Sequence, residues 1–430
     1  MAASTTASDR PAQADLDRCV HCGLCLNACP TYRELGVEMD SPRGRIFQMA
    51  QVAAGLLPIA NSYLEHIDLC LACRGCESAC PSGVEYGKLV EAARAEIEQV
   101  RRRSFPARLA RRFVYGRLLV SPRLLTLAGN LAALYQRSGL ERLVRASRIL
   151  RLSKRLEALD RLRPPAEPPF FFEQLGRTFP ARGERRYRVA FAAGCIANVS
   201  FARLNEATVR VLQQNGCQVE VPAAQTCCGA LHVHAGLREE ARALARRNVA
   251  AFAGGHYDAV ITNAAGCGST LKEYGELLGP EGRALAAKVR DVTEFLAAAG
   301  LNREMGPLNI TATYQDSCHL AHGQRIRSQP RELLAAVPGL RFRELPLADL
   351  CCGSAGVYNV EHTAMSMSLL EKKMQMAAST GADTIVTANP GCLLQLRAGA
   401  ALFGRHQRVL HVVEVLDEAY RKPATRAGPS

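Results

Sequence analysis

The sequence has no tryptophan, and aromatic residues make up only 6% of its 430 positions. No uninterrupted apolar run reaches the length of about 18 residues that a membrane-spanning helix needs. The first 17 residues are polar and lack the apolar stretch of a signal peptide, so we expect a cytoplasmic protein. A Gly-x-Gly motif opening a βα unit is also absent, which argues against a flavin or dinucleotide site in this chain.

Acidic residues are scarce in one region. Residues 101–163 contain 17 Arg or Lys and 3 Asp or Glu, and this difference of +14 equals the formal net charge of the whole chain. The same region carries two sets of apolar residues, each on one helical face: Leu124, Leu127, Leu131 and Leu134, then Ile149, Leu152, Leu156 and Leu159. We expect either a solvated helical pair packed on its own domain, or a docking surface for anionic lipid or an acidic partner. Nucleic acid is not expected as a partner, because no nucleic-acid-binding motif accompanies the charge.

Cysteine is abundant, with 17 residues, and the first eight form two copies of the pattern Cys-x2-Cys-x2-Cys-x3-Cys-Pro. Three cysteines at three-residue steps on a tight turn hold one metal cluster, and the fourth, before proline, ligates the neighbouring cluster. The doubled pattern predicts two [4Fe-4S] clusters with exchanged ligands. We assign Cys19, Cys22, Cys25 and Cys80 to the first cluster, and Cys29, Cys70, Cys73 and Cys76 to the second.

Structural zinc sites are the alternative, because Cys-x2-Cys knuckles also suit tetrahedral zinc. Zinc requires two separated knuckles rather than three successive steps, and it gives the closing Cys-Pro no role. Disulfides are not expected for a cytoplasmic chain. Iron–sulfur ligation therefore explains the pattern best.

A second repeat occupies the C-terminal half. Apolar strands are expected at residues 186–191 and 258–263, and again at 309–314 and 383–389. Each pair is accompanied by a Cys-Cys-Gly segment, and equivalent cysteines of the two copies lie 123 to 125 residues apart. Such constant spacing indicates a tandem duplication of an α/β unit.

Each copy places its outer cysteines just after the carboxyl end of a strand, where open α/β sheets build their sites. The adjacent pair is expected on a loop, followed by a glycine that permits unusual backbone angles. Four thiols then converge per copy, as a further cluster or a thiol site: Cys195, Cys227, Cys228 and Cys267, then Cys318, Cys351, Cys352 and Cys392. Cys217 is left over and is expected to be a small buried apolar residue.

Some polar residues near these cysteines have two interpretations. The histidines His232, His234, His319 and His322 either support a metal ligand by hydrogen bonding or transfer protons, or they have an ordinary structural role. Arg43 and Arg45, between the two cysteine runs, either donate hydrogen bonds that tune a cluster or begin a helix as solvated side chains.

The expected fold class is α+β, with several domains. We predict a helical two-[4Fe-4S] ferredoxin domain at residues 1–100, with helices at 46–54, 64–67 and 84–100. A basic helical connector and Pro-rich linker follow at 101–180. Two tandem α/β Cys-Cys-Gly repeats complete the chain, at residues 181–304 and 305–420.

Several strings resemble the iron–sulfur subunit family of glycolate oxidase (glycolate dehydrogenase), and together they span nearly the whole chain. They are residues 19–32, 40–46, 73–87, 227–230, 350–356 and 387–392. The combination of ferredoxin strings with two Cys-Cys-Gly repeats also occurs in heterodisulfide-reductase-like subunits, lactate-utilisation proteins and anaerobic glycerol-3-phosphate dehydrogenase subunits. The strings at 40–46 and 387–392 favour the glycolate family.

The resemblance implies a non-flavin electron-transfer subunit that is inactive alone. Its implied partners are FAD-binding glycolate dehydrogenase subunits, which oxidise glycolate to glyoxylate, and a membrane acceptor such as quinone, with peripheral contact at the inner face of the cell membrane. A heterodisulfide-reductase-like thiol/disulfide subunit, or the corresponding subunit of a lactate or glycerol-3-phosphate dehydrogenase, is the alternative. The heterodisulfide reductase pattern ends each repeat in Cys-x-x-Cys, whereas this sequence has Thr270 and Gln395 there. Five-thiolate clusters are therefore not expected.

Overall fold

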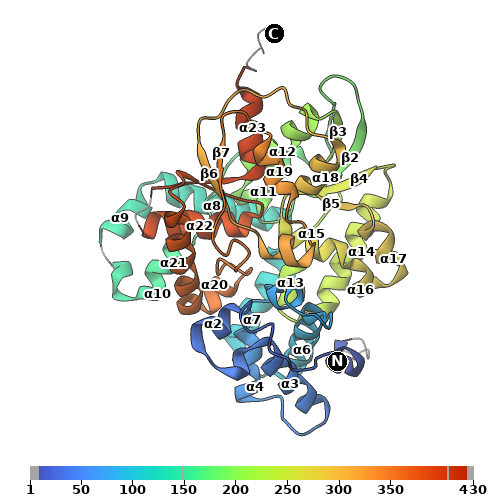
Figure 1. Cartoon of the computed structure of the whole chain (residues 1–430), viewed down its shortest axis with the longest axis vertical. Coiled ribbons are helices and arrows are strands. Elements are labelled where there is room, and N and C mark those ends of the chain that lie inside the picture. The colour runs from blue at the N-terminus through green and yellow to red at the C-terminus, as the bar shows by residue number, and fades with distance from the viewer. Residues whose placement is uncertain (1–8, 148, 404–405, 424–430) are drawn as a thin grey trace.

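The computed structural model describes residues 9–147, 149–403 and 406–423, and its N-terminal part is a small helical domain (Figure 1). Ser41 caps the third helix by accepting a hydrogen bond from the Gly44 amide, and Pro42 follows at the first helical position. This helix therefore starts four residues before the predicted 46. The elements are α1 Gln13–Leu16, α2 Pro30–Leu35, η2 Glu38–Asp40, α3 Pro42–Ala53, α4 Asn61–Asp68, α5 Gly75–Ser78 and α6 Tyr86–Val100.

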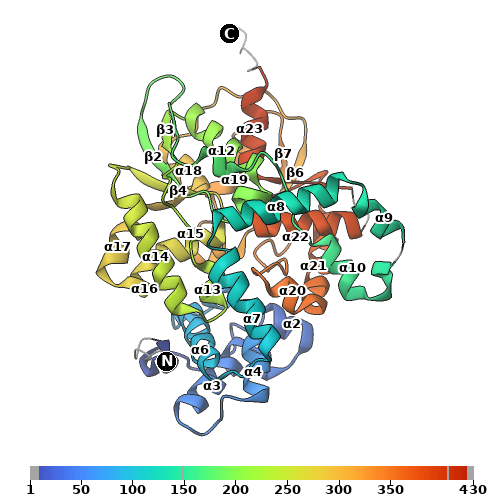
Figure 2. The ribbon, with the colours of Figure 1, turned by 180° about the vertical axis from the view of Figure 1, so that it is seen from behind.

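The basic connector is a series of short helices that runs up the back of the molecule (Figure 2). They are α7 Phe105–Phe113, η3 Val114–Leu118, α8 Pro122–Arg137, α9 Leu140–Ala146, η4 Ile149–Leu152 and α10 Lys154–Arg161. The second apolar face predicted from the sequence is divided, because η4 and α10 are separate helices on either side of Ser153. Within the described ranges, no single helix has the length and apolar character to cross a membrane. The α7–η3 segment and α8 meet that test only as a pair bent by 108°.

The first Cys-Cys-Gly repeat is built on a five-stranded sheet in the order β1-β3-β2-β4-β5. The strands are parallel except for β1, which pairs antiparallel with β3. Cys217 begins β3 and is fully buried, as expected for an apolar residue. The elements are η5 Phe171–Gln174, β1 Thr178–Phe179, β2 Tyr187–Phe191, α11 Ala197–Ser200, α12 Ala202–Gln214, β3 Cys217–Glu220, α13 Ala230–His234, α14 Arg238–Ala253, β4 Ala259–Thr262, α15 Ala265–Lys272, α16 Tyr274–Leu278, α17 Pro280–Ala286, β5 Val289–Asp291 and α18 Val292–Ala299.

The second repeat contains a four-stranded, fully parallel sheet in the order β7-β6-β8-β9. Its elements are β6 Thr311–Tyr314, η6 His319–Gly323, α19 Gln329–Ala335, β7 Arg341–Arg343, α20 Tyr358–Glu361, α21 Thr363–Ser379, β8 Thr384–Thr387, α22 Pro390–Leu402, β9 Arg408–His411 and α23 Val412–Arg421. The last helix of each repeat begins with a capping box, formed by Asp291 and Glu294 in α18 and by His411 and Glu414 in α23.

The two repeats share one hydrophobic core. The last helix of each repeat packs against an earlier helix of the other: α23 contacts α12, and α18 contacts α19. Arg210 on α12 donates two hydrogen bonds of 2.9 Å to Asp417 on α23, and a continuous set of buried side chains extends through both repeats. The structure confirms the expected α+β class, and the repeats form one folded unit.

Candidate metal centres

The two cysteine runs of the N-terminal domain adopt the same loop. In each run, the second residue after the first cysteine and the residue after the second cysteine have positive φ: His21 and Gly23, then Ala72 and Arg74. Residues other than glycine adopt this left-handed backbone conformation only at a cost in conformational free energy. A shared shape that includes such strained positions is expected of loops built to direct several sulfur atoms towards one point.

Four cysteines that are distant in the sequence line a single cavity of about 20 Å³. They are Cys29 from the first run and Cys70, Cys73 and Cys76 from the second, which we call the second cluster site. The first cysteine run thus contributes its last member to the second run. Four soft sulfur donors on one cavity wall are the donor set that a metal–sulfur group requires.

A buried arginine lies against the second cluster site. Arg45 is 1% exposed, and its guanidinium donates to the Thr31 hydroxyl (3.1 Å) and reaches the Cys29 sulfur at 4.0 Å. Burial alone would raise the pKa of the Cys70 thiol, but the charges of Arg45 and Arg94 lower it. Arg45 therefore favours the thiolate form that metal binding requires.

Arg43 has a different environment, because its side chain is at the surface and pairs with Glu38 at 2.6 Å. It also donates to the His21 carbonyl in the first cysteine run (3.0 Å). That run supplies three of the four cysteines that the sequence predicts for the first cluster site: Cys19, Cys22 and Cys25, with Cys80 from the second run. Cys22 is exposed and the other three are half-buried, so this site lies nearer to solvent than the second.

Each repeat gathers its four cysteines into a hydrogen-bonded chain of thiols. In the repeat-1 site, Cys195 contacts Cys227 at 3.4 Å, and the chain continues through Cys228 to Cys267. In the repeat-2 site the order is Cys318, Cys351, Cys352 and Cys392. Cys195 donates a hydrogen bond to Cys227 and Cys392 donates one to Cys352, and these bonds, together with burial, raise the pKa of both donor thiols. The four thiols of each repeat lie close together, and they can bind metal once they lose their protons.

The glycine after each cysteine pair shapes the loop. Gly229 and Gly353 both have φ near +88°, at 87° and 88°, a conformation in which other residues are strained. A Cβ at Gly353 would also lie 2.5 Å from the Ser366 carbonyl on α21, so the loop must approach the helix closely. The sequence predicted this loop and the role of its glycine.

Within the described part of the chain, no three His, Cys, Asp or Glu side chains surround a point that a single ion would occupy. Thr270 and Gln395, the positions of the missing fifth cysteines, have other roles: Thr270 lines a pocket, and Gln395 is fully buried and donates to Ser366 at 2.9 Å.

The ferredoxin domain brings its second cluster site into contact with repeat 2. Leu71 and Cys73 belong to one apolar cluster with Cys318, Cys351 and Tyr358. The Tyr358 hydroxyl also donates to the Leu69 carbonyl at 3.0 Å. The loop that carries Cys70 and Cys73 is therefore packed directly on the repeat-2 site.

The four predicted histidines are placed at domain contacts. His319 donates to the Ala72 carbonyl at 3.0 Å, and its ring lies 5.2 Å from that of His234. His322 accepts from Ser78 of the ferredoxin domain (2.8 Å), whereas His232 donates to the Tyr115 carbonyl of the connector (3.0 Å). Burial lowers the pKa of His319 to about 4 and also lowers that of His234. Both rings are therefore neutral near pH 7.

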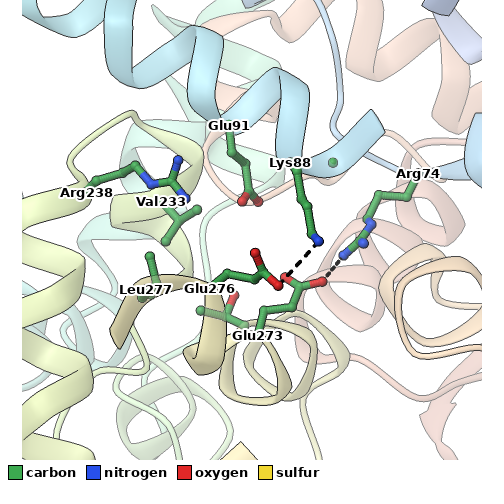
Figure 3. A pocket seen from close by; sticks show the side chains of 10 residues that line it. Arg74, Lys88, Glu91, Val233, Arg238, Glu273, Glu276 and Leu277 are labelled. Atoms are coloured by element: carbon green, nitrogen blue, oxygen red, sulfur yellow. Dashed lines mark hydrogen bonds and ion pairs between the residues drawn. The ribbon is translucent and has the colours of Figure 1, made fainter. Parts of the chain in front are cut away.

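A charged pocket of about 20 Å³ separates the ferredoxin domain from repeat 1 (Figure 3). Arg74 pairs with Glu273 across it, and Lys88 pairs with Glu276 at 3.3 Å. Glu91 of α6 points into the same space and lies 3.6 Å from Nδ1 of His234. The pocket is large enough for about one water molecule.

The sequence analysis did not identify three of the functional candidates. Lys373 is buried beside the repeat-2 cysteine pair, the Asn389 amide donates to the Cys392 sulfur at 3.5 Å, and Glu91 occupies the charged pocket. Lys373 directly follows another lysine, and Glu91 is one of several acidic residues on α6, so neither stands out. The Asn389 position within the Asn-Pro-Gly-Cys string was the one available indication.

Comparison with known proteins gives three family matches. A 4Fe-4S dicluster domain matches residues 15–84, a cysteine-rich domain matches 189–272 and 312–397, and the linker region of the glycolate oxidase iron–sulfur subunit matches 106–162. These matches identify the chain as an iron–sulfur protein, and confirm the two-cluster ferredoxin domain and the duplication.

Individual relatives match over most of the chain. The probable glycolate oxidase iron–sulfur subunit of Bacillus subtilis is 41% identical, covering 96% of this chain and 95% of that protein. The glycolate oxidase iron–sulfur subunit of Escherichia coli is 35% identical, with 96% and 97% coverage. Lactate utilization protein A of Geobacillus kaustophilus is 32% identical over 54% of this chain and 98% of its own length. The resemblance inferred from the cysteine strings is confirmed, and the chain belongs to the glycolate oxidase iron–sulfur subunit family.

Proposed function

We propose that the chain is the electron-transfer subunit of a glycolate (2-hydroxyacid) dehydrogenase complex. A partner subunit that contains FAD would oxidise glycolate to glyoxylate, and this chain would deliver the electrons to a membrane acceptor, quinone. The observation that carries the proposal is the packing of Cys73 and Cys318 against the apolar cluster that contains Cys351. Proximity of a ferredoxin cysteine to the cysteines of a repeat supports electron transfer between them.

The ligand sets follow from the thiol groups described above. We assign Cys19, Cys22, Cys25 and Cys80 to one [4Fe-4S] cluster, and Cys29, Cys70, Cys73 and Cys76 to a second. The repeat-1 and repeat-2 sites each supply four thiols for a further centre. Such clusters, when bound, supply one-electron transfer.

The protein's own contribution is to hold these groups and set their charge. Arg45 and Tyr86 face the second cluster site, where Tyr86 donates to the Cys70 sulfur at 3.6 Å and Arg45 provides a positive charge. Hydrogen bonds and charges near sulfur ligands tune cluster potentials. The apolar packing of Leu71 and Leu369 around the contact with repeat 2 excludes water from it.

A thiol/disulfide enzyme is less well supported. Cys227 and Cys352, one from each adjacent pair, are 2% and 1% exposed. A disulfide substrate would have to reach these sulfur atoms, and their burial prevents that in this conformation. We therefore favour electron transfer for both repeats.

The connector supports a peripheral contact with the inner face of the cell membrane. Phe105, Leu109 and Phe113 repeat every four residues along α7 and are all exposed, as are Leu127 and Leu131 on α8. Both helices lie on the same side of the molecule (Figure 2). An exposed apolar stripe within a strongly basic segment is typical of a helix that rests in an anionic lipid surface.

The enzymatic proposal is tested with the complete complex. Cys73→Ser and Cys22→Ser should each remove one [4Fe-4S] spectroscopic signal and abolish glycolate-dependent quinone reduction, because serine is a poor soft ligand. The isolated subunit should not oxidise glycolate. Full quinone reduction by either variant, or glycolate turnover by the isolated chain, would contradict the proposal.

The membrane contact is tested separately, with vesicles that contain anionic lipid. Arg145 is unsuitable for substitution because it already pairs with Glu141 and Asp160, and the side chains of Arg148 and Arg151 lie outside the described residues. Arg108→Gln with Arg112→Gln should weaken binding by about 2 kcal/mol, or roughly 30-fold, at low salt.

Arg246→Gln with Arg247→Gln removes two exposed charges on α14 and serves as the matched control. Equal binding by both double variants at all salt concentrations would show that the connector is only a solvated helical segment.

A further inference from the structure

Lys373, in the middle of α21, is buried next to the repeat-2 site. Its side chain is 2% exposed, and Nζ donates to the Leu347 carbonyl at 2.7 Å. Within the described part of the chain, no carboxylate forms an ion pair with it. A buried ammonium group is unfavourable unless a negative charge lies nearby.

The helix directs this ammonium towards the cysteine loop. Ser366, two turns earlier on the same face of α21, donates to the Gly353 carbonyl at 2.8 Å. Ser366 and Lys373 thus bind the two ends of segment 347–353, which carries Cys351 and Cys352. The Lys373 ammonium is therefore held against the start of the loop that carries the cysteine pair.

Repeat 1 has a neutral residue at the equivalent position. Gly229 packs against Ala241 as Gly353 packs against Ser366, and this pair of contacts aligns Asn248 with Lys373. Asn248 is also buried and also contacts its cysteine loop, where it donates to the Cys227 carbonyl at 3.0 Å. The duplication therefore kept a residue that braces the loop and gave it a charge in only one copy.

A second difference between the repeats also favours negative charge at the repeat-2 site. Asn389 donates an amide N–H to the Cys392 sulfur at 3.5 Å, whereas the corresponding residue of repeat 1, three positions before Cys267, is Ala264. Hydrogen bonds to ligand sulfur atoms stabilise the reduced state of a metal–sulfur centre. Both differences favour additional negative charge at the repeat-2 site.

We propose that Lys373 is the counter-charge of an anionic [4Fe-4S] centre held by the repeat-2 site, and that this centre is more easily reduced than the one in repeat 1. The inference rests on the proposed function to the extent that the repeats bind clusters. Reduction adds one electron from an external donor, such as dithionite, and increases the negative charge beside the ammonium. Lys373 is thus a residue that tunes the centre and does not ligate it.

The test is a redox titration of the cluster-loaded protein, followed by electron paramagnetic resonance. Lys373→Gln should lower the equilibrium constant for reduction of one centre by about tenfold or more, or about 59 mV for a one-electron couple. Lys373→Arg keeps the charge and should shift it much less. Lys372→Gln is the matched control, since Lys372 is exposed and pairs with Glu34 at 2.6 Å.

The affected centre is identified with Cys351→Ser, which should remove the same signal, whereas Cys227→Ser should leave it. If the Gln variant loses the centre while the Arg variant retains it, the requirement for charge is also established. Unchanged potentials in Lys373→Gln, with the repeat-2 signal present, would overturn the inference alone. Absence of any signal dependent on Cys351 in the wild type would overturn the cluster assignment of repeat 2 as well.

Discussion

The ferredoxin domain meets the two repeats through contacts of opposite chemistry. Towards repeat 2, Leu71 and Cys73 pack against Cys351 and Tyr358 in an apolar cluster. Towards repeat 1, charged side chains of α6 and the second cysteine run face Glu273 and Glu276 across a pocket (Figure 3). The two repeats, although they are copies of one unit, therefore contact the ferredoxin domain through different kinds of surface.

The apolar contact and the charged contact have different roles. The apolar contact places sulfur atoms of separate domains side by side in a region without water, where electrostatic effects are strong. The charged contact fixes the orientation of the ferredoxin domain through ion pairs and leaves a titratable carboxyl group at the boundary. We infer that electrons pass between the ferredoxin domain and repeat 2, and that the charged contact with repeat 1 mainly fixes the orientation of the ferredoxin domain.

The largest expected effect comes from replacing one cysteine by serine, and it should differ between repeat 2 and repeat 1. Cys351→Ser should reduce glycolate-dependent quinone reduction by the complex at least ~100-fold, because it removes a soft ligand at the contact with Cys73. Cys227→Ser, in repeat 1, should cost less than about tenfold. Steady-state rates of quinone reduction, with complex assembly checked by gel filtration, measure both. Equal losses would remove the distinction between the repeats.

A smaller effect is expected at the charged contact. Burial, followed by the charge of Glu273, raises the pKa of Glu91 to about 7, although Arg74, Arg238 and Arg94 oppose this, and the adjacent His234 is neutral. The folded protein therefore holds this proton more tightly than the unfolded chain, whose value is 4.5. The stabilisation is present below about pH 4.5 and is lost as the pH rises through about 7.

Glu91→Gln cannot ionise, so its stability relative to the wild type should increase between pH 4 and pH 8 by up to about 3 kcal/mol. Anaerobic urea denaturation at several pH values measures this difference. Glu276→Gln, at the half-exposed rim of the same pocket, is the control. A stability difference for Glu91→Gln that stays constant with pH would show that Glu91 is ionised in the same way in both states.

The smallest effect is expected for the hydrogen bond at the apolar contact. Tyr358→Phe removes the bond to the Leu69 carbonyl and should lower the free energy of unfolding by about 1 kcal/mol. Because the ring remains in place, Cys73 and Cys351 should stay in contact and the rate of quinone reduction should change little. A large loss of activity with unchanged stability would mean that the tyrosine hydroxyl has a direct role in electron transfer.

Much of the candidate site could be predicted because cysteine spacing carries its own geometry. The spacing of the runs that begin at Cys19 and Cys70 predicts loops around clusters, and the offset of 123 to 125 residues indicates the duplication. The position of Gly353 after its cysteine pair also indicated a loop. In these cases a few neighbouring residues determine the backbone conformation, so the loop can be predicted from the sequence.

The remaining features depend on which side of a helix is covered. Lys372 and Lys373 are indistinguishable in sequence, yet one is exposed and the other is buried beside the repeat-2 site. The leucines of α8 matched a core-facing pattern, but Leu127 and Leu131 face solvent. Periodicity shows that a helix has an apolar face, whereas only the tertiary structure shows what covers that face.

The reciprocal packing of helices between the repeats bears on whether one repeat could fold without the other. Because α23 covers α12 and α18 covers α19, each repeat completes the core of the other in a reciprocal way. This is the geometry of an isologous dimer whose two subunits have been joined in one chain. A chain with only one repeat could bury the same surfaces by pairing with a second copy of itself. Because the copies are joined in one chain, their equivalent positions can differ, as the buried Lys373 and Asn248 do.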